Sequence, residues 1–297
     1  MAALLERLGR DGAQVRTIDS LDDVDRDEDL VVAHVVGRAE PSLPILQAEL
    51  ARKVVLFIEQ PAEVDLVALA GMPALAALVV KRGVLGLDEM ALAVDKVLAR
   101  DAAGFDRYLP EAGVTRHTNL LSSTARGEML DELERFVAAL GLDGRRVAQV
   151  ATIADELITN AFYHAPVDGI GGHPYTHISR IDPVPCRPDH PVELAYASSA
   201  TRVAVRVRDT YGSLPPMSIL RHLARAIAEP TASFKVALGS GGARLGLVTA
   251  FRAASQLIFN VVPSQYTECI GIIEIGGSYR QFLEDGKALH VFSFPTR

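Results

Sequence analysis

The sequence predicts an α/β protein built from two domains. The first observation is length, because 297 residues exceed one ordinary core of about 150 residues and suit two. The second is the alternation of short β-branched runs with helical patterns over the first hundred residues. The third is a loss of periodicity at 101–122, after which helical patterns precede strands. We therefore expect domains at 1–100 and 123–276, a linker at 101–122 and a tail at 277–297.

Composition excludes several classes of protein. Hydrophobic residues make up 49% and charged residues 23%, a globular balance in which both halves should fold. The net charge of −7 argues against nucleic-acid binding, which needs clustered Lys and Arg. The long apolar run at 64–80 is interrupted by Gly71 and Pro73, so no membrane-spanning segment is expected. Two distant cysteines fit a reducing compartment, and the expected location is the cytoplasm.

The first hundred residues follow the order expected of a parallel sheet covered by helices. Strands are predicted where β-branched runs occur, and helices where apolar residues recur at helical spacing. The predicted strands are 13–18, 30–36, 54–58 and 75–80, and the predicted helices are 42–52, 61–70 and 87–100. Because the two kinds of element alternate, the expected architecture is flavodoxin-like.

This first domain resembles a response-regulator receiver in the order and spacing of its elements. Lys81 ends the last predicted strand, where a receiver keeps its lysine. A receiver also needs a phosphate-accepting aspartate at the end of its third strand. The strand that corresponds to it here is 30–36, which runs through His34 into Val36 without an aspartate. The resemblance therefore implies a degenerate receiver, or pseudo-receiver, that offers a docking surface to a signalling partner and is not phosphorylated.

The second domain is predicted to be an α/β sandwich of two helices followed by strands. Its first helix is capped by the hydroxyl residues at 122–124 and stopped by Gly141, and its second helix runs to His164. A long loop rich in Pro, Gly and His is expected at 166–191. The remaining predictions are strands at 192–196, 202–208, 257–262 and 267–275, and a helix at 245–256. The apolar tail is expected to pack or to form an interface.

Glu156 and Asn160 stand four residues apart and therefore on one face of the second helix. A carboxylate beside a carboxamide is costly to bury unless both groups find partners. Mg-ATP would supply them, because the carbonyl oxygen of Asn suits a hard divalent cation and Glu can orient or deprotonate an attacking water or hydroxyl. The alternative is an exposed polar stripe, which the apolar residues around the pair disfavour.

The segment from Glu156 to Ala165 matches ELxxNAxxHA, the asparagine box of the GHKL superfamily of histidine-kinase-like ATPases. The chain is most similar to the arm that contains anti-sigma-factor serine kinases and histidine-kinase ATP domains. The resemblance implies a Bergerat-type sandwich that binds ATP or ADP with Mg2+. It also implies Glu156 as the catalytic base, Asn160 as the magnesium ligand and His164 as a residue on the phosphate side.

A second motif lies at the end of a predicted strand, where the same family places DxGxG. Asp209 matches its aspartate and would accept the adenine amino group, with Gly212 beside it. Tyr211 and Ser213 occupy the two glycine positions, and the tyrosine could stack on the base or fill its pocket. The alternative is that Asp209 only starts a turn. Thr267 matches a family threonine that helps to hold adenine.

A third motif is the glycine-rich stretch 239–247, where the family reads GxGLGL. Backbone amides at such a helix start can hold phosphate oxygens, so Gly242 and Gly246 are binding candidates. Arg244 replaces the middle glycine and either grips phosphate or clashes with it. A flexible hinge is the alternative for this stretch taken alone. Residues 213–241 would then form the nucleotide lid.

Together these patterns predict a cytoplasmic bacterial signalling regulator that binds adenine nucleotide, with catalysis undecided. The alternatives are an active serine or threonine protein kinase of the anti-sigma type, and a nucleotide-free interaction module, which Tyr211, Ser213 and Arg244 favour. A sensor histidine kinase is excluded, since only one helix precedes the Glu156 helix in its domain. Protein partners are expected at the receiver-like domain or the lid, and a homodimer is left open.

Overall fold

The computed structural model describes residues 4, 6–8, 30–36, 54–69, 75–100, 103–111, 113, 115–229 and 242–294. The strands are β1 (Val31–Val36), β2 (Val54–Glu59), β3 (Leu75–Lys81), β4 (Thr115–Leu120), β5 (Val192–Ser198), β6 (Arg202–Asp209), β7 (Gln256–Val262), β8 (Tyr266–Glu274) and β9 (Ala288–Ser293). The helices are α3 (Glu63–Leu69), α4 (Leu87–Ala99), the short 3-10 helix η3 (Ser123–Ala125), α5 (Arg126–Ala139), α6 (Gly144–Tyr163), α7 (Pro216–Ala228), α8 (Gly242–Ala253) and α9 (Tyr279–Glu284). The predicted strand at 13–18 and helix at 42–52 lie outside the described residues.

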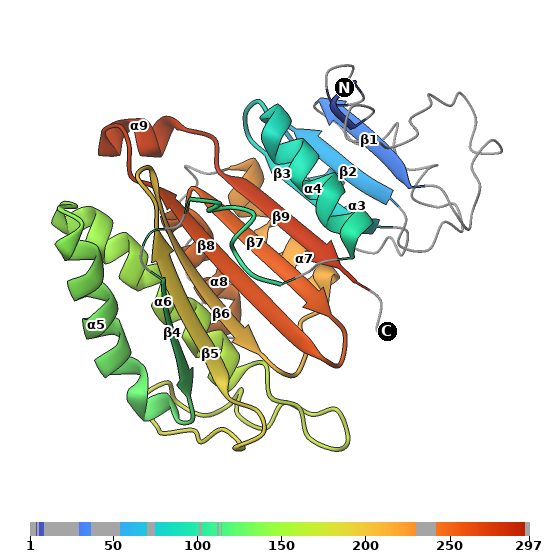
Figure 1. Ribbon diagram of the computed structural model, residues 1–297. Helices are drawn as coiled ribbons and strands as arrows, with labels where there is room; N and C mark the ends of the chain where they lie inside the picture. Colours follow the sequence, from blue (N-terminus) through green and yellow to red (C-terminus); the bar gives the residue numbers. More distant parts are fainter. Residues whose placement is uncertain are drawn as a thin grey trace.

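The described strands form one mixed sheet of nine strands in the order β1-β2-β3-β9-β7-β8-β6-β5-β4 (Figure 1). Strands β1, β2 and β3 are parallel, and the ladder from β7 through β8, β6 and β5 to β4 is antiparallel. The mixed α/β class predicted from the sequence is confirmed. The expected division into two domains does not appear as two sheets, because the sheet continues from one half of the chain into the other.

The link between the halves is β9, which lies between β3 and β7. It is antiparallel to β3 and parallel to β7, with Val291 opposite Leu78 on one side and Phe259 on the other. The predicted tail at 277–297 therefore contributes a central strand. The packing role expected of its apolar residues is confirmed, since Leu289 and Phe292 are fully buried.

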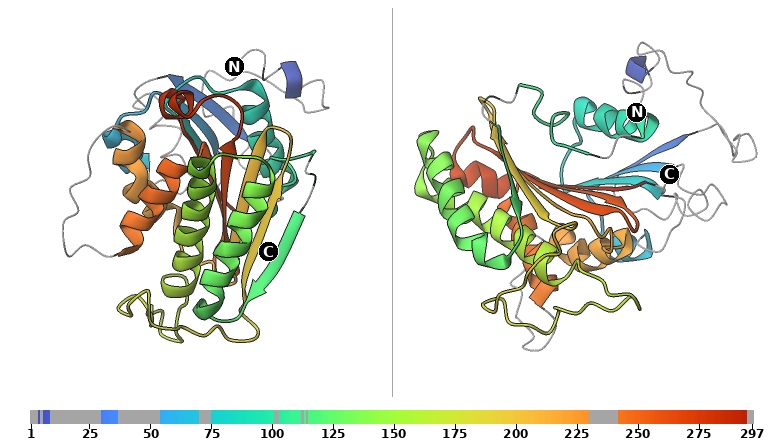
Figure 2. Two further views of the ribbon diagram at one scale, coloured as in Figure 1. Left: turned by 90° about the vertical axis from the view of Figure 1, so that its left-hand side faces the viewer. Right: turned by 60° about the horizontal axis from the view of Figure 1, so that its bottom comes forward.

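Helices cover both faces of the sheet (Figure 2). Helices α3, α5, α6, α7 and α8 pack on one side, which we call the helical face. Helix α4 and part of segment 103–113 pack on the other side, which we call the α4 face. Successive side chains of a strand point to opposite faces, so in β7 Leu257 and Phe259 face the helical face and Ile258 faces the α4 face. Strands buried on both faces read as continuous apolar runs, and for this reason β2 and β3 were predictable.

Two segments that were expected as a linker and as a lid contain regular secondary structure. The linker expected at 101–122 contains β4, an edge strand whose side chains are mostly exposed. The lid expected at 213–241 contains α7, which buries Ile219 and Leu223 completely against the helical face. In β4 the missed signal is weak, since an exposed edge strand has no apolar alternation. In α7 the apolar residues do recur at helical spacing.

A buried polar chain ties α4 to the sheet. The Lys96 ammonium, 1% exposed, donates to Oδ1 of Asn260 at 2.8 Å. Asn260 in turn donates to Oε1 of Glu268 at 2.9 Å, and this carboxylate also accepts from the backbone amide of Gly104 at 2.9 Å. Burial raises the pKa of Glu268, while the charges of Arg206 and Lys96 oppose that rise. The network therefore depends on its cations to remain ionised inside the protein.

We predict that Lys96→Ala lowers the free energy of unfolding by about 3–5 kcal/mol, because it leaves buried polar groups without their cation. Arg280→Ala is the matched control, since Arg280 pairs with Glu284 on the surface of α9 and such pairs contribute about 0.5 kcal/mol or less. Urea unfolding followed by circular dichroism measures both. A loss below about 1 kcal/mol for Lys96→Ala would contradict this role of the buried chain.

Candidate functional site

Helix α6 carries the predicted catalytic pair on the helical face. Its start is fixed by Asp143, whose Oδ1 accepts from the backbone amides of Arg145 and Arg146 at 2.8 and 3.0 Å. Its middle lies directly on β8, where Gly271 has no side chain and leaves room for Ile153. The helix is therefore held both at its start and at its middle, upstream of the pair.

Asn160 stands out because the two polar atoms of its side chain are buried without partners. Neither Oδ1 nor Nδ2 of its carboxamide has a hydrogen-bond partner among the described residues. Its backbone oxygen, by contrast, accepts from the amides of His164 and Ala165, each at 3.0 Å. Buried polar groups are normally paired, and an unpaired one costs about 1–3 kcal/mol. A ligand that offers both a positive charge and a hydrogen-bond acceptor would satisfy this carboxamide.

Glu156 lies one turn before Asn160 and faces α8. A Cβ atom on Gly246 would lie 2.6 Å from Oε2 of Glu156, so a glycine lets the two helices approach here. The structure therefore brings together two residues that the sequence placed in separate motifs. The same Oε2 accepts from Nη1 of Arg180 at 3.1 Å, and the Glu156 side chain keeps only 15% of its exposure.

Arg180 was missed by the sequence reasoning. It belongs to the loop 166–191, which was expected only to be long and rich in Pro, Gly and His. In the structure the loop is anchored to η3, since Val184 is buried and its amide donates to Oγ of Ser123 at 2.8 Å. The hydroxyl of Tyr163 donates to the backbone oxygen of Asp182 at 2.8 Å. No sequence pattern reports a contact that depends on the path of such a loop.

The glycine-rich motif is described only in part. Helix α8 runs over Gly242–Ala253, three residues earlier at each end than the helix predicted at 245–256, so Gly242 lies in its first turn. Residues 230–241 and the side chain of Arg244 lie outside the described part of the chain. The roles of Gly242 and Arg244 in phosphate binding therefore stay predictions.

Asp209 ends β6 and is buried at the start of a turn. Its Oδ1 accepts from the backbone amides of Tyr211 and Gly212 at 2.9 and 3.2 Å. Thr267 lies opposite it in the register of β6 and β8. Burial raises the pKa of Asp209 to about 6, although the hydrogen bonds from Tyr211, Gly212 and Thr267 lower it. Asp209 therefore holds the turn through Oδ1, and adenine binding by this residue stays a prediction.

Each residue at which the sequence departs from the DxGxG pattern makes a specific contact in the structure. Gly212 adopts a φ of 59°, and a side chain there would collide with the backbone of Val262 at the β7–β8 turn. Tyr211 stacks on His190 with ring centroids 5.0 Å apart. The hydroxyl of Ser213 donates to the backbone oxygen of Ala165 at 2.6 Å. The glycine is therefore needed one position away from the family pattern, and its neighbours tie this turn to α6 and to the loop 166–191.

His164 caps the C-terminal end of α6, and the ring is neutral at pH 7. Burial, together with the positive charge of Arg180 and the ring of His173, lowers its pKa to about 4. A neutral imidazole offers a hydrogen bond but no charge to a phosphate. Any cation on this side of the site must come from another residue.

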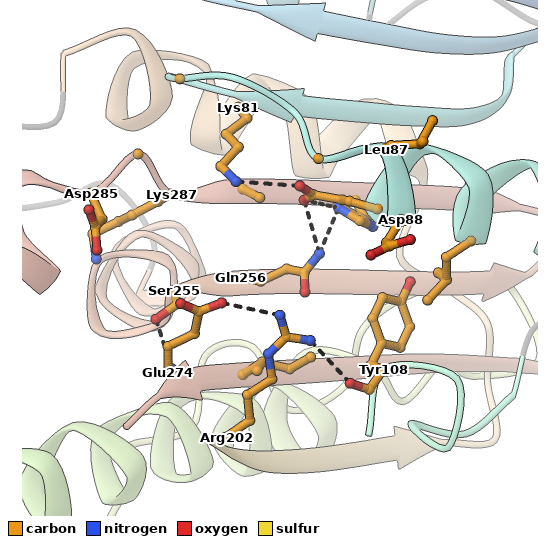
Figure 3. Close-up of a pocket in the computed structure, with 18 of the residues that line it drawn as sticks. Lys81, Leu87, Asp88, Tyr108, Arg202, Ser255, Gln256, Glu274, Asp285 and Lys287 are labelled. Carbon is orange, nitrogen blue, oxygen red and sulfur yellow. Dashed lines mark hydrogen bonds and ion pairs between the residues drawn. The ribbon is translucent and has the colours of Figure 1, made fainter. Parts of the chain in front are cut away.

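A cavity of about 1090 Å3 lies on the α4 face, opposite the face that carries Glu156 (Figure 3). Figure 3 shows Gln256 in the middle of its floor, between Lys81 and Arg202. Arg202 pairs with Glu274 at 3.2 Å, and Lys81 pairs with Glu89 at 3.4 Å. Large cavities are the usual first candidates for ligand sites. Here, however, many of the polar side chains already satisfy one another.

The network on the cavity floor joins the two halves of the sheet. Glu89 of α4 accepts from Nε2 of His290 on β9 at 2.8 Å and from Gln256 on β7 at 3.2 Å. Burial would raise the pKa of Glu89, but its hydrogen bond with His290 and the charges of His290 and Lys81 hold it at about 2. We therefore assign these residues to the junction and keep the candidate site at α6 and α8.

Metal-ligating clusters and membrane-spanning helices are both absent from the described part of the chain. No group of three or more His, Cys, Asp or Glu side chains among those residues is placed to hold a metal ion. No described helix is long and apolar enough to cross a membrane.

The fold and site define a mixed α/β protein with one continuous sheet, whose helix α6 presents Glu156 to α8 and, one turn later, the unpaired carboxamide of Asn160. No protein-family model matches the chain, and no curated protein sequence matches it. Among solved structures, it is similar to a chain of "The crystal structure of SiaB-SiaC complex from Pseudomonas aeruginosa", with 16% identity and a TM-score of 0.36. The match covers 61% of this chain and 98% of that one. Likeness at this level identifies neither family nor function.

We predict that Asp209 makes stability fall as pH rises between about 4 and 6. The folded protein holds this proton up to a pKa of about 6, whereas an unfolded aspartate releases it near 3.9, so ionisation favours the unfolded chain. Relative to wild type, Asp209→Asn should therefore gain about 2–3 kcal/mol in free energy of unfolding between pH 4 and pH 7. Urea unfolding of both proteins at the two pH values measures it, and a constant difference would show that burial does not raise this pKa.

Proposed function

We propose that the chain is a signalling regulator that binds an adenine nucleotide with Mg2+ between α6 and α8, as a member of the GHKL superfamily would. The observation that carries the proposal is the carboxamide of Asn160, whose two polar atoms are buried without partners one turn from Glu156. An unpaired buried group is tolerated where a ligand completes it. The order of the three motifs along the chain supports the same assignment.

The residues present fit the nucleotide and its cation. Asn160 would offer its carbonyl oxygen to Mg2+, and Glu156 would orient or accept a proton from an attacking group. Bound Mg2+ would supply positive charge at the phosphates. Asp209 would accept the adenine amino group with Oδ2, since Oδ1 already holds the turn. Thr267 would also lie near the adenine, because it is the register partner of Asp209 on the neighbouring strand β8.

The regulatory part of the proposal concerns the first hundred residues. We propose that they form a pseudo-receiver that binds a protein partner in the cytoplasm. Strand β1 ends at Val36 without an aspartate, and Lys81 is engaged with Glu89. Both features suit a surface that docks a protein and accepts no phosphoryl group. Because β3 pairs with β9, such docking would act on the same sheet that carries the nucleotide site.

A protein serine or threonine kinase is the second candidate. The observation that favours it is Glu156, a carboxylate that is largely buried next to α8 where a base would be needed. The hydrogen bond from Arg180 occupies an oxygen of this carboxylate. We therefore expect slow turnover, and a binding role comes first.

We predict that ATP and ADP bind the full chain with micromolar to millimolar affinity, about −4 to −8 kcal/mol, in the presence of Mg2+. Asn160→Leu should abolish this binding. It should also raise the free energy of unfolding of the nucleotide-free protein by about 1 kcal/mol, because an apolar group replaces an unsatisfied one. Isothermal calorimetry and urea unfolding measure the two effects.

Asn119→Leu is the matched control, because Asn119 is exposed on β4, away from α6 and α8. It should leave nucleotide affinity unchanged. If neither nucleotide produces heat or a thermal shift at millimolar concentration with wild type, the nucleotide-binding proposal is wrong. A nucleotide that binds Asn160→Leu as tightly as wild type would place the site elsewhere.

We also predict that ATP turnover is slower than about one per second, near the lower edge for ordinary kinases. Glu156→Gln should abolish what turnover there is and keep the nucleotide bound, whereas Glu128→Gln, an exposed change on α5, should not alter it. Single-turnover assays with radiolabelled ATP measure both. Wild-type rates at or above one per second would favour the kinase over the binding role.

A further inference from the structure

The loop 166–191 places a cation directly between two motifs of the candidate site. Nη1 of Arg180 donates to Oε2 of Glu156 at 3.1 Å. A Cβ atom on Gly246, in the first turns of α8, would lie 3.5 Å from Nη2 of the same guanidinium. The guanidinium therefore stands where α6 and the N-terminal part of α8 meet. Helix N-termini attract anions, so a phosphate held by α8 would lie within reach of this cation.

Arg180 is held by its backbone and keeps partial exposure of its side chain. Its carbonyl oxygen lies 3.1 Å from the hydroxyl of Tyr163 and 3.5 Å from Nη1 of Arg126. Arg126 is fixed in turn by its ion pair with Asp155 on α6. The side chain of Arg180 remains 35% exposed. The base of the residue is thus positioned, while its guanidinium can turn from one partner to another.

The guanidinium also supplies a positive charge that His164 cannot supply. His164, expected on the phosphate side, has its pKa lowered to about 4 by burial, with further contributions from Arg180 and His173, and is neutral at pH 7. Arginine suits phosphate because its planar donors can hold two oxygens at once. Glu156 offers the same guanidinium a single carboxylate, so the two anions would compete for it.

We infer that Arg180 is a phosphate ligand that distinguishes nucleoside triphosphate from diphosphate. Without a terminal phosphate, Arg180 holds the Glu156 carboxylate. With a triphosphate bound, Arg180 turns to the terminal phosphate and releases Glu156 toward the attacking group. The inference rests on the proposed function and adds to it a preference for the triphosphate.

The test compares binding of Mg2+ with ADP or with a non-hydrolysable ATP analogue, by calorimetry on the full chain. Wild type should bind the analogue at least about tenfold more tightly than ADP, since charged hydrogen bonds to phosphate are strong. Arg180→Met should lose this preference and keep its ADP affinity. Arg187→Met is the matched control, because Arg187 is in the same loop, exposed and paired with Asp189 at 2.7 Å. It should behave as wild type.

A double substitution tests the competition itself. Glu156→Gln removes the charge that holds Arg180, so the affinity for the ATP analogue should rise severalfold. In Glu156→Gln combined with Arg180→Met, that rise should disappear. Circular dichroism and the thermal midpoint of each variant check that it is folded.

The outcomes separate this inference from the proposed function. If wild type binds neither nucleotide, both are wrong. Suppose that wild type binds both nucleotides, and that Arg180→Met either keeps the preference for the ATP analogue over ADP or loses affinity for both equally. Nucleotide binding then stands, and Arg180 is no phosphate sensor. Equal affinity of wild type for the analogue and for ADP would likewise rule out Arg180 as the sensor and leave nucleotide binding in place.

Discussion

The insertion of β9 between β3 and β7 is the constraint on which the rest of the structure depends. It turns a parallel three-stranded unit and an antiparallel ladder into one sheet, and each neighbour supplies a full row of hydrogen bonds. Side-chain networks then form across the seam. Glu89 of α4 binds His290 of β9 and Gln256 of β7, and Lys96 reaches Asn260 on the same face. The two halves are therefore expected to unfold together.

The local elements of the fold could be read from the sequence, whereas their pairing could not. Strands β2 and β3 are buried along almost their whole length, and buried strands consist of continuous runs of apolar residues that can be recognised in the sequence. The position of β9 depends on pairing Ala288–Ser293 with residues some two hundred positions earlier, which leaves no local pattern. Strand β4 was missed for the opposite reason, since an exposed edge strand such as Thr115–Leu120 needs no apolar side.

The residues of the candidate site also divide into those that could be predicted from the sequence and those that could not. Glu156 and Asn160 were identifiable because four-residue spacing fixes their common face before any tertiary structure exists. The sequence placed Glu156 and Gly246 in separate motifs, and the structure brings these two residues together. Arg180 could not be found, because its distance from Glu156 is set by the path of an irregular loop. Gly212 shows a further limit of prediction from sequence. The position of this glycine is set by the close approach of the Val262 backbone, which is a tertiary contact that a sequence motif does not report.

The environment of α8 limits how the site can respond to a ligand. Its C-terminal end runs into β7 through Ala254 and Ser255, and both are fixed: Ala254 is fully buried, and Ser255 exchanges backbone hydrogen bonds with Ile272 and Ala288. A shift of α8 along its axis would have to break these bonds and disturb Gln256, which holds Glu89 at the junction. Rotation of a partly exposed side chain breaks far fewer contacts. Changes at the site on ligand binding should therefore fall on the side chains of Glu156 and Arg180, while the helices that carry the site stay in place.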